Sequence, residues 1–266
     1  MITYPFTYKR AKSVDEAVAL LSASPDGKLL AGGQTLIAAM KMRLANPSDL
    51  IDISGIKELS YIRAGAGAVA IGAGTTHFEV SASKEVAKAI PALGHLASVI
   101  GDPAVRHKGT IGGSVANNDP AADYPAAVLG LGATVKTNRR SIAADDFFQG
   151  MFATALEEGE IVTEISFPVP EKAAYKKFAN PASRYAMAGV FVVKFADGIR
   201  VAVTGAGPCV FRVPEMEAAL AKSFTPDAVA KIAVSPEGLN SDIHGSAEYR
   251  ANLVTVMAKR AVAEAA

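Results

Sequence analysis

The sequence is nearly free of cysteine and carries almost no net charge. Cys209 is the single cysteine among 266 residues, so the chain cannot build a disulfide, a structural zinc site or a thiolate-held iron–sulfur cluster by itself. The formal net charge is +1, and both signs are interspersed. This balance argues against a surface for nucleic acid or for an anionic membrane.

Long apolar runs are also missing. No run reaches the roughly 18 residues of a membrane span, and the N-terminus lacks the charged and apolar regions of a secretion signal. We therefore expect no membrane span and a cytoplasmic location. Half of the residues are apolar, mostly Ala and Val, which predicts a mixed α and β protein of one large or two ordinary domains.

The first part of the chain mixes helices and strands. Ser13 predicts a helix N-cap, with Glu16 completing a capping box. A helix is expected to start at Thr75 or Thr76, and another helical stretch to break near Pro91. Strands are expected over residues 28–33, 49–54, 69–74, 133–137 and the stretch before 168, and further helices over 35–44 and 124–131.

Beyond Pro168 and Pro170 the pattern changes. Residues 174–180, 186–195 and 199–207 alternate apolar and polar side chains and predict an antiparallel meander. Helices are expected over 213–222, 225–234 and 247–265. We place a domain boundary near residue 172, giving domains 1–172 and 173–266, and expect an α+β fold rather than a doubly wound sheet.

Two glycine pairs, at 32–33 and 112–113, suggest a phosphate site. A strand–Gly–Gly–helix corner leaves several amide N–H groups free beside the positive end of a helix. One such corner alone could equally be a tight turn that needs a positive φ. The G-x-G-x-x-G and G-x-x-x-x-G-K-[ST] motifs are absent. Two corners together could hold the two phosphates of a dinucleotide from opposite sides.

Several other side chains are open to more than one interpretation. In "NNDPAADYP", Asp123 is the best acceptor for ribose or ribityl hydroxyls, but Asp119 and Asp123 could instead cap the helix that begins near Tyr124. His77 could be catalytic or could cap and pack a helix, and Arg106 could bind phosphate or lie on the surface. No Ser/His/Asp or Cys/His arrangement supports a hydrolase.

The stretches "AGGQTLIAAMKMRLANPSDLIDI" and "RHKGTIGGSVANNDPAADYPAAVLGLGA" resemble the FAD-binding medium subunit of the molybdenum hydroxylases. This family includes aerobic carbon monoxide dehydrogenase, the xanthine dehydrogenases and related aldehyde or N-heterocycle hydroxylases. "SRYAMAGVFV" and "DIHGSAEYRANLVTVMAKRAV" resemble its C-terminal flavoprotein domain, so the similarity extends over essentially the whole chain.

The resemblance implies a two-part FAD-binding domain of the vanillyl-alcohol-oxidase/PCMH type over 1–172. It implies a small C-terminal domain with a three-stranded antiparallel sheet and helices, and FAD held without a covalent bond. It places the pyrophosphate between two sets of residues. The first is Ala31, Gly32, Gly33, Gln34 and Thr35, and the second is Thr110, Ile111, Gly112, Gly113 and Ser114.

Three more positions follow from the resemblance. Asp123 matches an acid that contacts the ribityl or adenosine part, and Tyr185 an aromatic over the isoalloxazine face, although it could also be ordinary strand packing. A basic residue of the pair Lys176 and Lys177, with Lys177 preferred, would stabilise the negative charge of reduced flavin near N1.

The sequence departs from the family in its first motif. Relatives close to carbon monoxide dehydrogenase usually read Gly-Gly-His-Ser there, whereas this chain has Gln34 and Thr35 after the glycines. The change removes one candidate histidine for covalent flavin attachment and weakens assignment to the carbon monoxide branch. One branch of the family carries a cysteine-bearing insertion that holds an extra iron–sulfur cluster. With Cys209 as its single cysteine, this chain has no such insertion.

The implied function is electron transfer within an oxidoreductase. A large subunit would hold the molybdenum cofactor, a small subunit the [2Fe–2S] clusters, and this chain FAD but no metal or catalytic acid or base. Electrons would leave to a quinone, NAD⁺, oxygen or a redox protein, and the usual assembly is a dimer of heterotrimers. The alternatives are a self-sufficient FAD oxidase, against which the short length argues, and a non-catalytic nucleotide- or phosphate-binding module.

Overall fold

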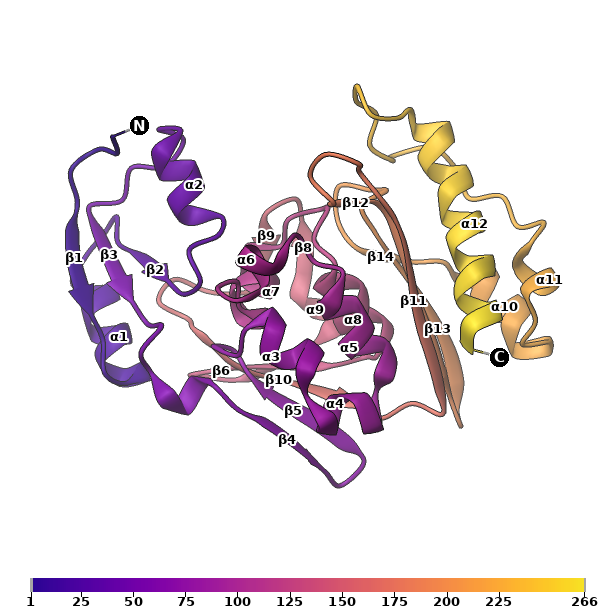
Figure 1. Cartoon of the computed structure of the whole chain (residues 1–266), viewed down its shortest axis with the longest axis horizontal. Helices are drawn as coiled ribbons and strands as arrows, with labels where there is room; N and C mark the ends of the chain where they lie inside the picture. Colours follow the sequence, from indigo (N-terminus) through magenta and orange to yellow (C-terminus); the bar gives the residue numbers. More distant parts are fainter. Residues whose placement is uncertain (1, 266) are drawn as a thin grey trace.

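The computed structural model describes residues 2–265 as three regions that follow one another along the molecule (Figure 1). The N-terminal region is a small parallel sheet in the order β1-β3-β2. Ala17, Ile51, Ile56 and Leu59 form its core. Its elements are β1 (Thr7–Arg10), α1 (Val14–Ser22), β2 (Lys28–Leu30), α2 (Leu36–Lys41) and β3 (Asp49–Asp52).

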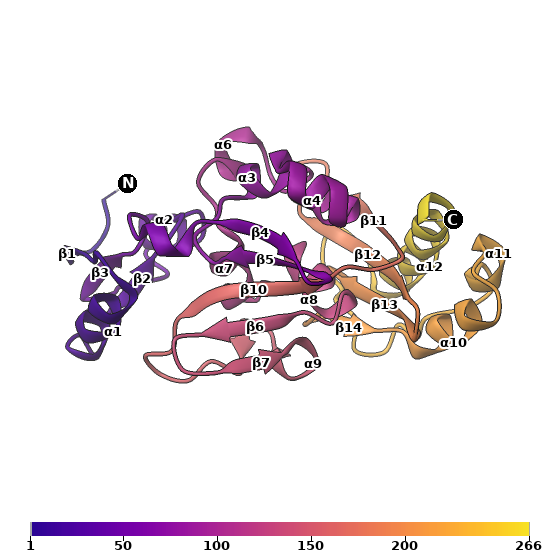
Figure 2. The same ribbon diagram turned by 90° about the horizontal axis from the view of Figure 1, so that it is seen from below.

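The middle region is a five-stranded antiparallel sheet in the order β4-β5-β10-β6-β7, seen in Figure 2. Its strands are β4 (Ile62–Gly65), β5 (Ala68–Gly72), β6 (Thr134–Thr137), β7 (Ser141–Ala143) and β10 (Val162–Pro168), with the hairpin β8 (Phe148–Gly150) and β9 (Ala153–Thr154). Its helices are the 3-10 turn Lys57–Leu59, α3 (His77–Ala82), α4 (Lys84–Ala89), α5 (Pro91–Ser98), α6 (Pro103–Arg106), α7 (Ile111–Asn117), α8 (Tyr124–Gly130) and α9 (Ala144–Phe147).

The C-terminal region is an antiparallel sheet in the order β11-β12-β13-β14. Its elements are β11 (Lys172–Ala179), β12 (Ala186–Phe195), β13 (Gly198–Thr204), β14 (Phe211–Arg212), α10 (Pro214–Lys222), α11 (Pro226–Val229) and α12 (Ala247–Ala265). The three expected strands are β11 to β13, and the two-residue β14 extends the sheet to four.

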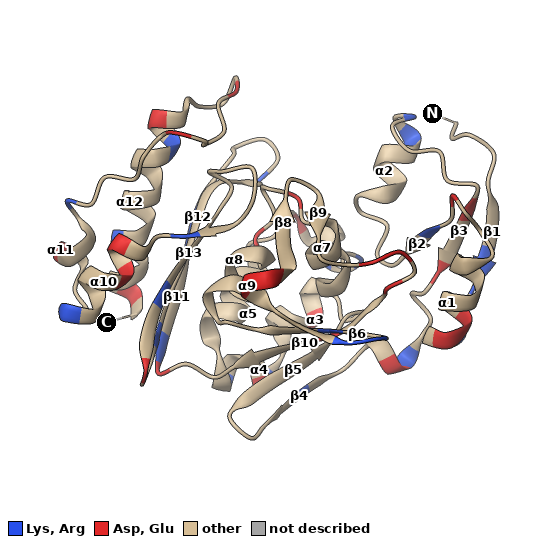
Figure 3. Ribbon diagram, turned by 180° about the vertical axis from the view of Figure 1, so that it is seen from behind, with Lys and Arg blue, Asp and Glu red and all other residues tan. Residues whose placement is uncertain are grey.

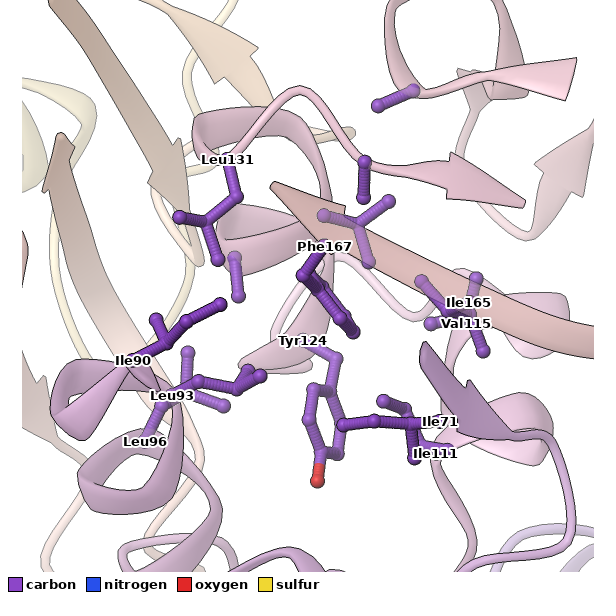
Figure 4. Close-up of a cluster of buried hydrophobic side chains, with 14 of the residues drawn as sticks. Ile71, Ile90, Leu93, Leu96, Ile111, Val115, Tyr124, Leu131, Ile165 and Phe167 are labelled. Carbon is purple, nitrogen blue, oxygen red and sulfur yellow. The ribbon is translucent and has the colours of Figure 1, made fainter. Parts of the chain in front are cut away.

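Strand β12 is buried on both faces. Val190 and Val192 pack toward α10 and α12, whereas Phe191 and Val193 belong to the core of the middle region. Figure 4 shows part of that core, where side chains of β5, β10, α5, α7 and α8 converge around Tyr124. A single hydrophobic core therefore joins residues on both sides of residue 172.

Local signals predicted helix starts better than helix lengths. Thr76 and Glu79 form a complete capping box at α3. Ser13 caps α1, but the Glu16 carboxylate accepts from the Lys12 N–H (2.7 Å), so the expected capping box is only half formed. The helix expected over 225–234 ends at Val229, and the chain beyond it is held against α12 by a hydrogen bond from the Thr255 hydroxyl to the Ile232 carbonyl (2.8 Å).

Charges of both signs are intermixed along the ribbon, as Figure 3 shows. Within residues 2–265, no helix has both the length and the apolar character needed to cross a bilayer.

Glu160, just before β10, is expected to make stability depend on pH. Its carboxylate accepts hydrogen bonds from Arg140 (Nε, 3.0 Å), the Thr137 hydroxyl (2.7 Å) and the Glu157 N–H (2.9 Å). These bonds, that from Arg140 foremost, lower the pKa of Glu160 to about 2. Since the unfolded pKa lies near 4.3, the stabilisation is present above that value and is lost as the pH falls toward 2.

The test is Glu160→Gln. At pH 7 we expect the free energy of unfolding to fall by about 2 kcal/mol, a figure reduced for solvent screening because Arg140 is 43% exposed. In urea unfolding the gap between variant and parent should shrink as pH falls from 5 to 2.5. The exposed Glu158→Gln is the control, and a gap that does not change with pH would contradict the assignment.

Candidate functional site: two glycine motifs and the strand ends beside them

The first glycine motif forms the turn between β2 and α2. Gly33 has a φ of +70°, which glycine adopts without strain. Thr35 stands at the N-cap position of α2. In the described part of the chain, the backbone N–H groups of residues 32–35 have no protein acceptor. Successive unpaired amides in a turn are typical of a binding site for phosphate.

The second motif is not a loop, because Gly112 and Gly113 lie in the first turn of α7. The N–H groups of the first two helical residues donate to the carbonyl groups of Thr75 and Ala73, at 3.0 and 2.9 Å. The N–H of Gly113 donates to the Thr110 hydroxyl. The expectation of a second corner with free amides is therefore wrong, since these amides fasten α7 to the end of β5.

The two motifs touch each other. A Cβ on Gly32 would lie 2.1 Å from the carbonyl oxygen of Lys108 and 2.7 Å from Cα of Gly109. A Cβ on Gly113 would stand 3.9 Å from Cβ of Ala31 and, apart from the capping hydroxyl, would meet no other atom within 4 Å. Gly32 is thus required for the contact between the motifs, whereas Gly113 is exposed beside it.

A buried histidine supports the second motif from behind. The backbone N–H of His77 donates to the Gly109 carbonyl (3.0 Å). The ring lies against the same residue, since a Cβ on Gly109 would be 2.6 Å from Nε2 of His77. Burial, with a smaller effect of Arg106, lowers the pKa of His77 to about 4, so the ring is neutral at pH 7. Arg106 donates to the carbonyls of Ile100 and Gly101.

Asp123 and Lys177 meet in a buried ion pair, Nζ to Oδ1 at 2.9 Å, with side chains 4% and 5% exposed. The Tyr175 hydroxyl donates to Oδ1 (2.6 Å), and Lys177 also donates to the Val99 carbonyl (2.8 Å). Burial raises the pKa of Asp123, and Lys177 opposes this shift. Asp123 stands at the N-cap position of α8 without a capping hydrogen bond, while the Asp119 carboxylate accepts from the Ala121 N–H.

Tyr185 lies on the turn between β11 and β12, with half of its surface exposed (50%). The turn is closed by hydrogen bonds between the backbones of Asn180 and Tyr185 and of Arg184 and Asn180. Arg184 has a φ of +62°. Burial, followed by the charges of Asp119 and Asp123, raises the pKa of Tyr185, so the phenol is neutral at pH 7.

Sequence reasoning missed Tyr175 and Thr204. In the sequence both residues belong to the alternating strands expected over 174–180 and 199–207, and nothing there distinguishes them from their neighbours. Tyr175 and Lys177 stand two residues apart on one face of β11, and both reach Asp123. That i, i+2 spacing was the available signal, but the sequence does not show which acid faces the strand.

Two family models match the chain in succession. The FAD binding domain in molybdopterin dehydrogenase covers residues 4–170, and the CO dehydrogenase flavoprotein C-terminal domain covers residues 173–265. Among curated relatives, the carbon monoxide dehydrogenase medium chain of Hydrogenophaga pseudoflava is 38% identical over 98% of this chain and 97% of its own length.

Two further comparisons agree. The glyceraldehyde dehydrogenase medium chain of Sulfolobus acidocaldarius is 36% identical over 99% of this chain and all of its own length. A chain of the reconstituted CO dehydrogenase from Oligotropha carboxidovorans superimposes with a TM-score of 0.93 at 36% identity, covering 100% of this chain and 99% of that chain. The chain therefore belongs to the family of FAD-binding subunits of molybdenum-dependent dehydrogenases.

Proposed function

We propose that the chain holds FAD non-covalently and uses it to pass electrons from a [2Fe–2S] subunit to an external acceptor. The observation that carries the cofactor site is the run of unpaired amides at residues 32–35, held in contact with the capped start of α7. These amides would bind the pyrophosphate, with Ala31 and Ser114 beside it and the exposed Gly113 leaving room for close approach.

The other residues of the site have separate roles in this proposal. The exposed ring of Tyr185 would pack against the isoalloxazine, and Thr110 and Ile111 would fix the start of α7 behind the phosphates. Gln34 is exposed and contributes its backbone N–H, since an amide side chain adds no charge. Direct contacts of Asp123 and Lys177 with the cofactor would require their ion pair to open, so we assign the closed pair an indirect role.

FAD, when bound, would supply a carrier that can take up electrons singly from the iron–sulfur subunit and release them to the acceptor. The partners in this proposal are a molybdopterin-binding large subunit and a [2Fe–2S] small subunit, arranged as a dimer of heterotrimers. The full-length similarity to proteins named medium chains supports the large and small partners of this proposal. Relatives of similar identity are named for glyceraldehyde, nicotine and carbon monoxide, so the substrate is set on another subunit.

Gly113→Val tests the site directly. A Cβ here would lie 2.9 Å from the Thr110 hydroxyl and 3.9 Å from Cβ of Ala31, so only that hydroxyl must shift. We expect the full chain to fold but to bind FAD at least about tenfold more weakly, because the side chain fills the phosphate approach. Gly65→Val is the matched control, since a Cβ there meets nothing within 4 Å and β4 favours a β-branched residue. Quenching of FAD fluorescence and the visible spectrum after removal of free flavin report binding.

Three outcomes would contradict the proposal. Equal FAD affinity of Gly113→Val and parent would remove the phosphate site from this motif. A folded parent, alone and with its copurified partners, that binds ADP but never FAD would indicate a nucleotide-binding module. Oxidation of an organic substrate by the chain without partner subunits would indicate a self-sufficient oxidase.

A further inference from the structure

The short segment 119–123, between α7 and α8, is fastened to the C-terminal sheet. The Pro120 carbonyl accepts from the Gly205 N–H (2.8 Å), and the Ala122 carbonyl accepts from the Thr204 hydroxyl (2.6 Å). The Ala121 carbonyl accepts from the backbone N–H of Ala186, the residue after Tyr185, at 3.4 Å. Three successive carbonyls of the segment are thus bonded to β12 and to the end of β13.

The end of the segment carries the buried ion pair. Asp123 accepts from Tyr175 and Lys177, both on β11. Lys177 also reaches the Val99 carbonyl at the end of α5. The charges of Asp123 and Lys177 therefore satisfy each other within the protein, away from solvent.

Close packing leaves this arrangement little freedom. Gly205 has a φ of +83°, and a Cβ there would lie 2.3 Å from the carbonyl oxygen of Ala186. Thr204 is 1% exposed and Tyr175 is fully buried. Neither side chain can touch a cofactor on the surface of the fold, so any influence they have on FAD must act through the segment.

The segment connects the two parts of the proposed cofactor site. Its N-terminal end continues from α7, which carries the second glycine motif. In its middle, the Ala121 carbonyl is hydrogen-bonded to Ala186, the neighbour of Tyr185. A displacement of the segment would therefore change the distance between the phosphate motif and the Tyr185 ring. Buried ion pairs contribute little net stability, and their best-attested use is to fix a register.

We propose that Tyr175, Lys177 and Thr204 are positioning residues that hold segment 119–123, and thereby set the α7 motif and Tyr185 at the spacing FAD requires. They do so without touching the cofactor. We call Tyr175, Lys177 and Thr204 the clamp; Asp123 is the residue of segment 119–123 to which Tyr175 and Lys177 bind, rather than a ligand of the ribose. The inference rests on the proposed function, because it assigns the residues their role through FAD binding.

The test compares Tyr175→Phe and Thr204→Val with Thr255→Val. Thr255 also donates its hydroxyl to a backbone carbonyl, that of Ile232 (2.8 Å), but far from segment 119–123. The readouts are the FAD dissociation constant, the visible circular dichroism of bound FAD and the thermal midpoint. We expect each clamp variant to weaken FAD binding about 3- to 10-fold and to alter the flavin dichroism, while Thr255→Val lowers only the midpoint.

The inference predicts non-additivity as well. Since both residues act on one segment, the Tyr175→Phe/Thr204→Val double variant should weaken FAD binding less than the product of the single effects. Hydrogen exchange at residues 180–186 should speed up in both single variants and not in Thr255→Val.

Two results would overturn the inference while leaving the proposed function intact. In the first, the parent binds FAD and the clamp variants behave like Thr255→Val, which makes the bonds purely structural. In the second, only Asp123→Asn and Lys177→Met change FAD affinity and flavin dichroism, which makes these two residues direct ligands. A parent that takes up no FAD, alone and with its copurified partners, overturns the proposed function and the inference with it.

Discussion

Replacing Gly32 with alanine is expected to abolish most FAD binding and to destabilise the fold by about 2 to 3 kcal/mol. The new Cβ would stand 2.1 Å from the carbonyl oxygen of Lys108 and 2.7 Å from Cα of Gly109. These are backbone atoms, which cannot rotate away as a side chain can. The two motifs must therefore separate, and the amides of residues 32–35 lose their position beside α7.

Gly33→Ala is the matched control for this variant. Its φ of +70° makes alanine costly by about 1 kcal/mol, but the nearest atoms belong to the flexible side chain of Ile37. The second motif is not disturbed. In FAD titrations we expect Gly32→Ala to bind at least about 100-fold more weakly than the parent and Gly33→Ala to stay within about tenfold. Similar affinities for the two variants would disprove that contact between the motifs forms the site.

Arg250→Met is expected to give the second large effect, a loss of about 3 kcal/mol in the free energy of unfolding. The guanidinium, on a residue only 5% exposed, donates to the carbonyls of Met187 (2.8 Å) and Gly205 (3.1 Å) and to the Asp242 carboxylate (2.8 Å). Methionine fills similar volume but removes the guanidinium from both carbonyls, and the Gly205 carbonyl keeps only a long contact with the Asn240 amide (3.5 Å).

The control for this variant is Arg260→Met, an exposed position on the same helix. Removing its charge should change the free energy of unfolding by less than about 0.5 kcal/mol. Urea unfolding monitored by far-ultraviolet circular dichroism gives both values. A small effect of Arg250→Met would mean that water replaces the guanidinium at these carbonyls.

Local sequence determined most of the elements. The apolar alternation after residue 172 predicted β11, β12 and β13, and capping residues predicted the starts of α1 and α3. The paired motifs at their spacing indicated the family that the comparisons confirm. These features are readable because caps, turns and side-chain alternation depend on neighbours along the chain.

Other features depended on partners far away in sequence. Nothing near Gly112 shows that the amides of α7 are taken up by carbonyls at the end of β5, so two similar motifs appeared equivalent although only the first leaves its amides unpaired. Lys177 and Asp123 are 54 residues apart. The sequence does not show that Lys177 pairs with Asp123. In the structure they form an ion pair because the C-terminal sheet packs over α8.

The sequence by itself therefore determined the order of elements and the family, and it indicated the region in which we propose the cofactor site. The tertiary structure alone decided which glycines join the two motifs, which amides are unpaired and which charges are buried together. The physical reason is that an amide or a carboxylate becomes available for a ligand only if no acceptor or donor elsewhere in the fold satisfies it first. That competition is settled by packing between distant segments.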